Sequence, residues 1–402
     1  MTSVRYEQSM KVNSKTIAGT PADIARVSWQ WQKNDVPSQL VHDLYSAYLK
    51  GRREPNDTAI HEGLKSFLQS VEAYVRSRVS ERDRAVCVLC KHACEQARSA
   101  VDQNAIDHAC RHLGKALSVT AIPDVSAEAR HRCRAEILPV EAYVDLRCGD
   151  AKAARRRYIE SLKADQKLED DFGPKSIHAH RIHVAIRLAG VEGVASRWKE
   201  ATELTVALFM YLAGKTQALP LPGDWGPKYI GTLSPEMVQF LALQLTYELA
   251  GWLAESSSAT VHEVMGRILA SAAFRDEEAR NFWNSSTRNW LELKMLSTGA
   301  TMPFLWNCLF FLEGGPRQSI SIWLAGALDA VAICDVLAPD AAAPFKSDVV
   351  NSVKALKYVP IRLQRAAWHM GAGMVSSQSQ ASKFSGDVKS LLYPTNNPQP
   401  QN

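Results

Sequence analysis

The sequence predicts an all-α protein of stacked antiparallel helical hairpins, similar to an α-solenoid, followed by a second helical block. Apolar residues recur at spacings of three and four along most of the chain, and no convincing run shows the alternation that a strand requires. In addition, residues 138–165 (LPVEAYVDLRCGDAKAARRRYIESLKAD) read as two helices joined at Cys148-Gly149-Asp150. Such a pair of helices is the unit from which helical repeat proteins are stacked.

The apolar periodicity places the expected helices in two groups. The first group comprises Ala85–Ala97, Ile106–Val119, Ala127–Leu146, Ala151–Leu162, Ile182–Leu188 and Val194–Leu212. The second group comprises Pro235–Leu253, Val261–Phe274, Glu278–Leu296, Ser321–Leu337 and Ser347–Met370. Helices with one apolar face bury that face against other helices, so we expect helix-on-helix packing throughout.

The composition between these groups predicts the domain boundaries. Residues 216–234 (TQALPLPGDWGPKYIGTLS) are too rich in proline and glycine to continue a helix, and we expect a loop or linker there. We therefore predict an N-terminal helical or irregular segment at 1–57, a helical repeat region at 58–215 and a C-terminal helical domain at 235–374. The polar tail at 375–402 predicts disorder.

A short pattern recurs in the first group: a small or β-branched residue, a bulky residue four positions later, and a small residue three positions after that. It occurs at Ala109/Leu113/Ala116, Ala154/Tyr158/Ser161 and Val194/Trp198/Ala201, with successive starts 45 and 40 residues apart. Small residues let helices approach closely while the bulky residue fills the neighbouring groove, as in stacked hairpins.

This region resembles the tetratricopeptide repeat family, whose second helix carries a small, aromatic, small pattern after a Gly-Asp turn. Gly149-Asp150, Ala154, Tyr158, Ser161 and Leu162 match that pattern. The family's first-helix aromatic would fall on Asp145 and its closing proline on Gln166, so the chain resembles a divergent form of the repeat. The resemblance covers residues 80–215 and implies stacked helical hairpins.

Composition indicates an ordinary globular chain. The 402 residues are 46% hydrophobic and 22% charged, which is enough to bury substantial cores. The formal charge of +5 is weaker than the basic footprint of a dedicated nucleic-acid binder, so we do not expect nucleic acid as a partner. The N-terminus lacks the apolar core of a signal peptide, and eight cysteines spread through helical patterns indicate reduced thiols in the cytoplasm.

The strongest apolar segment, Ile320–Leu337, approaches the length of a membrane span. It carries Asp329 near its middle, and Met302–Leu312, which precedes it, is too short to span. Two neighbouring apolar segments with a central charge favour a buried helical hairpin, so we predict no membrane span.

Cysteine and histidine are dense in residues 87–148, which raises the possibility of a metal site. Cys87, Cys90 and Cys94 form a single helical stripe without nearby glycine or proline, and this favours small buried core residues over metal ligands. Downstream, His178, His180 and His183 lack the carboxylate of an H-E-x-x-H motif, so surface or capping roles are expected. No metal and no cofactor is predicted.

These observations favour a noncatalytic scaffold or adaptor that binds a protein or peptide through the groove of residues 80–215. The candidate partner contacts are Tyr158, Trp198, Arg155 and Arg156, because aromatic anchors with arginines at the rim are common at interfaces.

Two alternatives remain open at this stage. One is a helical enzyme or sensor that binds a metal or cofactor through residues 87–148, with Cys87, Cys90 and Cys94 as ligands. The other is a secreted bacterial effector, because the first twenty residues hold six Ser or Thr and one acid.

Overall fold

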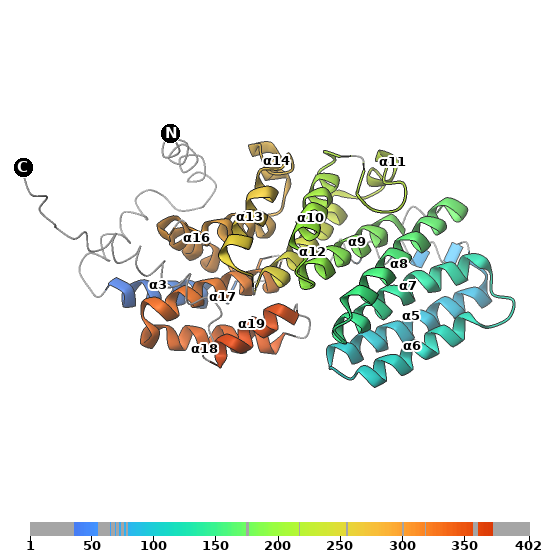
Figure 1. The fold of residues 1–402 in the computed structure, drawn as a ribbon, viewed down its shortest axis with the longest axis horizontal. Coiled ribbons are helices and arrows are strands. Elements are labelled where there is room, and N and C mark those ends of the chain that lie inside the picture. The colour runs from blue at the N-terminus through green and yellow to red at the C-terminus, as the bar shows by residue number, and fades with distance from the viewer. Residues whose placement is uncertain are drawn as a thin grey trace, which may run out of the picture. The chain divides into compact units, whose positions relative to one another are not determined.

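The computed structural model describes residues 36–54, 79–173, 177–216, 218–254, 256–299, 301–317, 319–356 and 361–372, and the single positions 65, 69, 72, 73, 76 and 77. Every regular element within these residues is a helix, which confirms the predicted all-α class (Figure 1). The expected tail at 375–402 and the first twenty residues lie outside them.

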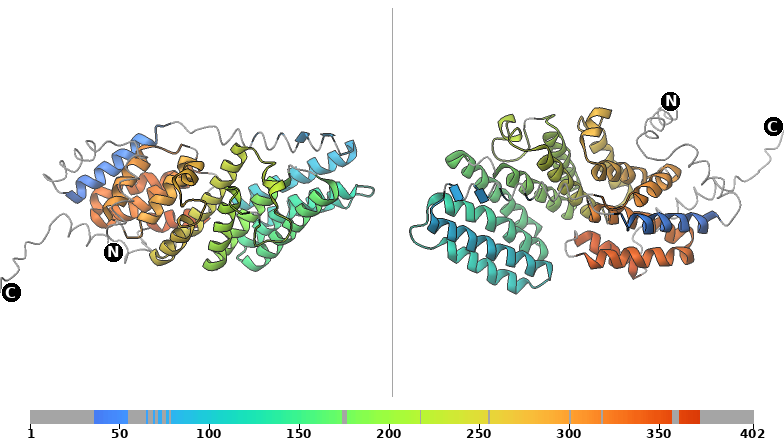
Figure 2. Two further views of the ribbon diagram at one scale, coloured as in Figure 1. Left: turned by 90° about the horizontal axis from the view of Figure 1, so that it is seen from above. Right: turned by 180° about the vertical axis from the view of Figure 1, so that it is seen from behind.

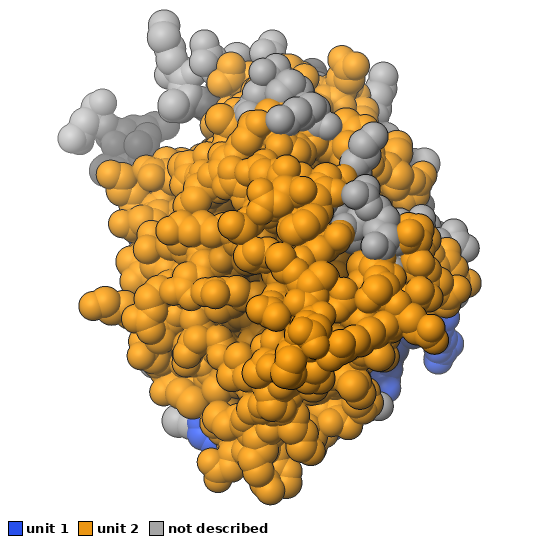
Figure 3. Space-filling model, turned by 90° about the vertical axis from the view of Figure 1, so that its right-hand side faces the viewer, with its two compact units in different colours: residues 1–56, 254–262, 288–402 blue, residues 57–253, 263–287 orange. Residues whose placement is uncertain are grey.

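The chain divides into two compact units, coloured separately in Figure 3. Unit 1 comprises residues 1–56, 254–262 and 288–402, and unit 2 comprises 57–253 and 263–287. The proline- and glycine-rich residues 216–234, expected to form a loop or linker, lie inside unit 2. They are held there by contacts described below.

Unit 2 is built from antiparallel hairpins. The first pairs α5 (Glu81–Asp102) with α6 (Ile106–Thr120), the second pairs α7 (Ala127–Arg147) with α8 (Ala151–Phe172), and the third pairs α9 (Ile177–Val194) with α10 (Trp198–Leu212). The first helices α5 and α7 also pack against each other, and α9 packs against α12 (Pro235–Leu253), which follows the third hairpin in the sequence (Figure 1). This arrangement of adjacent pairs agrees with the expected hairpin packing. The short helices α11 (Pro227–Ile230) and α14 (Glu277–Phe282) complete the unit.

The connection at Cys148-Gly149-Asp150 joins two helices, as predicted. Gly149 has a φ of 87°, a left-handed conformation that glycine adopts at low cost, so α7 ends there. The Asp150 side chain accepts a hydrogen bond of 2.8 Å from the Ala153 backbone amide and caps the start of α8. Two local signals therefore fix the turn.

The recurring small and bulky positions lie in helix contacts in two of their three occurrences. Ala109, Leu113 and Ala116 on α6 and Ala154, Tyr158 and Ser161 on α8 are all buried. In the third occurrence the expected helix Val194–Leu212 is interrupted, because α9 ends at Val194 and α10 begins at Trp198. Ser196, with a φ of 58°, makes the turn, while the nearby Gly193 still belongs to α9.

Helices α9 and α12 approach closely at two glycines. A Cβ atom on Gly193 would overlap the Trp252 ring, and one on Gly190 would overlap the Glu248 carboxylate. Because Trp252 is almost fully buried and cannot withdraw, the absence of a side chain at Gly193 sets the separation of these two helices.

We expect Gly193→Ala to destabilise unit 2 by about 1–3 kcal/mol, the typical cost of overpacking a core. The matched control is Gly114→Ala in α6, where a Cβ would meet nothing within 4 Å. That change should raise stability by up to about 1 kcal/mol because alanine favours the helix. Thermal unfolding of both variants checks the prediction, and equal midpoints would contradict it.

Unit 1 contains α3 (Val36–Gly51), α16 (Thr301–Glu313), α17 (Ile320–Leu337), α18 (Pro339–Ala355) and α19 (Ile361–Gly371). Helices α13 (Ser258–Leu269) and α15 (Ser285–Leu296) contribute residues to both units. Although it comes from the opposite end of the sequence, α3 packs beside α18 (Figure 2). Tyr48 of α3 stacks on Trp323 with ring centroids 4.8 Å apart and bonds the Ser352 hydroxyl at 2.9 Å.

Helix α17 is the one described helix whose length and apolar composition would suit a membrane span, and most of its residues are buried inside the protein. Asp329, near its middle, accepts two hydrogen bonds from the Lys294 ammonium of α15, at 2.7 and 2.9 Å. Since Lys294 is itself buried, each charge compensates the other within the helical core.

Candidate functional site

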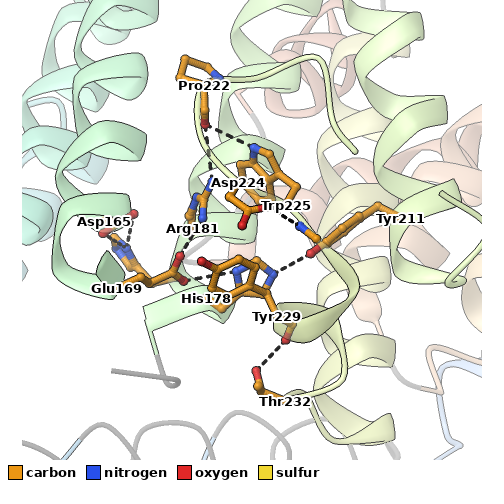
Figure 4. Close-up of polar contacts among 12 residues, drawn as sticks. Asp165, Glu169, His178, Arg181, Tyr211, Pro222, Asp224, Trp225, Tyr229 and Thr232 are labelled. Atoms are coloured by element: carbon orange, nitrogen blue, oxygen red, sulfur yellow. Dashed lines mark hydrogen bonds and ion pairs between the residues drawn. The ribbon is translucent and has the colours of Figure 1, made fainter. Parts of the chain in front are cut away.

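A fully buried arginine, Arg181 of α9, lies at the centre of a polar cluster in unit 2 (Figure 4). Its guanidinium donates to Glu169 Oε2 of α8 at 2.6 Å and sits over the Trp225 ring, 3.9 Å from the ring centroid. The Pro222 carbonyl oxygen lies 3.5 Å from the Arg181 guanidinium and 3.2 Å from the Trp225 indole nitrogen, which donates to it. We call these residues the Arg181 cluster.

His178, one turn before Arg181, extends this cluster to α10. Its Nδ1 lies 3.2 Å from Glu169 Oε1 and its Nε2 lies 2.8 Å from the Tyr211 hydroxyl, while its ring stacks on Tyr229 (Figure 4). The side chain is completely buried, so the surface or capping role expected for this histidine is wrong. Sequence spacing could not reveal the partners, because they come from three other segments.

The Arg181 cluster explains why residues 216–234 belong to unit 2. Trp225 and Tyr229 lie in that stretch, and both rings face the Arg181 guanidinium. Gly223, with a φ of 107°, brings the backbone so near that a Cβ would overlap Arg181 and Gln166. We interpret the cluster as a structural anchor for this loop, because its charged groups are all buried.

We expect Arg181→Met to destabilise unit 2 by about 3–5 kcal/mol, because the buried Glu169 carboxylate loses its cation. Limited proteolysis should then cut within 216–234 faster than it cuts the wild type. The double variant Glu169→Leu with Arg181→Met removes both charges and should recover part of the loss, as measured by thermal unfolding. A single variant as stable as the double one would contradict this explanation.

A second polar group lies along α5, α7 and α9, the first helices of the three hairpins, and on α12, which packs against α9. Arg98 of α5 pairs with Glu136 of α7 at 3.7 Å, and Arg187 of α9 pairs with Glu248 of α12. A third pair joins His180 of α9 to Asp165 of α8. We call these charged pairs, with His183, the first-helix face.

His180 is oriented by a buried carboxylate. Its Nδ1 lies 3.1 and 3.0 Å from the two carboxylate oxygens of Asp165, which is fully buried on α8. Burial opposes the charged imidazole, but Asp165 and Glu136 outweigh it and raise the pKa of His180 above its ordinary value. The sequence offered no carboxylate near this histidine, and the fold supplies one from the neighbouring helix.

His183, one turn further along α9, has the opposite tendency. Burial, followed by the charges of Arg187, His180 and Arg98, lowers the pKa of His183 well below its ordinary value. Arg187 Nε donates to His183 Nε2 at 3.4 Å, which fits a neutral ring acting as acceptor. The two histidines therefore favour different protonation states.

We expect acid to destabilise the protein through His183. The pKa of His183 in the folded protein lies below the ordinary value of 6.5. Its contribution to the free energy of unfolding is therefore complete above pH 6.5 and is lost as the pH falls through the folded pKa. The pKa of His180 is raised in the folded protein, so its contribution to stability is complete below pH 6.5 and is lost only at higher pH. Between about pH 7 and 5, the melting temperature of His183→Gln should therefore fall less than that of the wild type. Parallel melting curves across that range would refute the assignment.

The four predicted partner contacts lie in different surroundings. Tyr158 is buried on α8, where burial raises its pKa to about 12 and Arg187, Glu248 and Arg98 act on the same hydroxyl. Trp198 is half-buried and stacks on Trp252, and Arg155 is bonded to Glu192 at 2.7 Å, while Arg156 is exposed. Their binding roles stay predictions.

The predicted cysteine stripe lies in the core of the first two hairpins. Cys87, Cys90 and Cys94 of α5 are buried beside Cys133 of α7. Hydrogen bonding to the Cys133 sulfur, together with burial, raises the pKa of the Cys87 and Cys90 thiols, which disfavours the thiolate that binds metals. Among the described residues no group of three His, Cys, Asp or Glu side chains is placed to hold a metal ion.

Sequence reasoning missed Arg98, Glu136, Asp165, Arg187 and Glu248. One signal was available, because His180, His183 and Arg187 follow each other at spacings of three and four along one helix. The carboxylates gave no signal, since they lie on other helices.

The chain matches no known protein family, no characterised protein and no solved structure in comparisons of each kind. The fold and the first-helix face therefore define it only as an all-helical protein with packed adjacent helix pairs.

Proposed function

We propose that this protein is a noncatalytic scaffold or adaptor that binds a protein or peptide on the first-helix face of unit 2. The observation that carries the proposal is the row of partly exposed side chains that runs over successive first helices. Arg98 and Glu136 join α5 to α7, Tyr143 of α7 donates to Asp102 of α5 at 2.7 Å, and Arg187 reaches Glu248 on α12.

Two physical features favour a binding role. Side chains already held by neighbouring helices lose little conformational freedom when a ligand arrives, which lowers the cost of association. In addition, hairpins that repeat in space present similar positions at regular intervals, a geometry suited to an extended partner. On this proposal the hairpins are a divergent repeat similar to the tetratricopeptide family, and the partner is bound in the cytoplasm.

Photo-crosslinking in the native cell tests the proposal. A photoreactive amino acid replaces Glu95, which is exposed on α5 one turn before Arg98, and in a matched variant it replaces Leu117, which is exposed on α6. We expect one protein to be captured from position 95 and not from position 117, as identified by mass spectrometry. Capture from position 117 alone would place the interface elsewhere, and capture from neither would contradict a binding role.

A further inference from the structure

The charged pairs of the first-helix face are layered, with the carboxylate beneath the cation. Side-chain exposure is 43% for Arg98 against 24% for Glu136, 17% for His180 against 0% for Asp165, and 38% for Arg187 against 16% for Glu248. An approaching ligand therefore meets hydrogen-bond donors before it meets acceptors. Arg155 covers Glu192 in the same way elsewhere, so layering alone does not define a binding site.

Within the part of the chain that the structure describes, the arginines of this face have N–H donors that form no hydrogen bond, as Arg155 has, whose guanidinium bonds Glu192 through Nε alone. A guanidinium carries five N–H donors. Arg98 approaches Glu136 at 3.7 Å, too far for a hydrogen bond, and Arg187 uses Nε on His183 and one terminal nitrogen on Glu248. Among the described residues no hydrogen bond to the other terminal nitrogen of Arg187 is formed, so both arginines can receive a further acceptor.

The cations also converge on one place. His180 and Arg187 lie one turn before and one turn after His183 on α9, and Arg187 Nε donates to the His183 ring at 3.4 Å. Arg98 of α5 is near enough for its charge to act on both histidines. The lowered pKa of His183 favours its neutral ring, which is only partly buried and adds no charge of its own to this group. Each cation is already paired with a carboxylate, so an anion bound beside His183 would be held by the unused N–H donors and not by an excess of positive charge.

We propose that this convergence binds the side-chain carboxylates of an acidic peptide segment, with Arg98, His180 and Arg187 as the donors. The inference rests on the proposed function and specifies the chemistry of its partner. Carboxylates suit guanidinium donors because two oxygens can accept two parallel N–H bonds.

A polyphosphate partner is disfavoured on this face. Glu136, Asp165 and Glu248 lie directly beneath the cations and offset their charge. Nucleic-acid binding draws on a large excess of basic groups, and the whole chain carries a formal charge of only +5.

Fluorescence anisotropy of the full chain with four labelled probes tests the proposal. The probes are short peptides that alternate glycine with glutamate, glutamine or lysine, and a single-stranded oligothymidine. We expect binding of the glutamate peptide alone, and we expect added salt to weaken it. A glutamine peptide that binds equally well, a glutamate peptide that does not bind, or preferred binding of the oligothymidine would each overturn the proposal.

Charge-neutral variants then locate the site. Arg98→Gln and Arg187→Gln should each weaken binding of the glutamate peptide about tenfold, the effect of losing one charge-assisted hydrogen bond. Arg111→Gln, an exposed position on α6, removes the same charge and should keep the wild-type affinity. Equal losses in all three variants would reduce the effect to net charge and overturn the assignment.

A spectroscopic readout guards against a misfolded variant. In the wild type, the imidazole proton resonances of His183, assigned by comparison with His183→Gln, should titrate at higher pH once the glutamate peptide is bound, because a nearby anion favours the protonated ring. An unchanged titration in the presence of bound peptide would place the peptide elsewhere.

The two proposals fail in distinguishable ways. If the wild type and the variant carrying both Arg98→Gln and Arg187→Gln capture the same cellular protein equally well, the binding role stands and the acidic chemistry is wrong. If the wild type captures none, the binding role itself fails.

Discussion

A guanidinium that is removed from water has to be held by an anion, and in unit 2 the pair formed by Arg181 and Glu169 positions three segments of the chain. It joins α8 to α9, and through Trp225 and the Pro222 carbonyl it holds the loop after α10. Desolvation makes such a pair costly to break, since the remaining charge would be stranded in the core. The loop is therefore part of the hairpin stack although its composition resembles a linker.

The same principle applies with partial exposure on the first-helix face. There the carboxylates of Glu136, Asp165 and Glu248 are fixed between helices while the cations above them reach solvent. Helix pairs that bury their apolar sides against one another leave the remaining side of each first helix to carry these groups. A surface of pre-positioned donors thus follows from packing, and it is the feature on which both functional proposals depend.

Local signals in the sequence were sufficient for much of the fold. The periodicity predicted the helices, and Gly149-Asp150 predicted the turn between α7 and α8, because a left-handed glycine and a capping aspartate act within a few residues. The break at Ser196 could not be predicted in this way. The nearby Gly193 lies within α9 and not at the left-handed position, and Glu192, which bonds Arg155 of α8 and Arg197, couples the turn to the neighbouring helix.

The candidate site depended far more on tertiary structure. By itself the sequence determined the helical class, the hairpin at residues 138–165 and a cysteine stripe, since each follows from the spacing of residues along one helix. Only the fold decided that His178 is buried, that Asp165 holds His180, and that Arg98 lies close enough to act on His183, 85 positions away in the sequence. These relations are set by which helix faces meet, and helical periodicity carries no information about the partner across the interface.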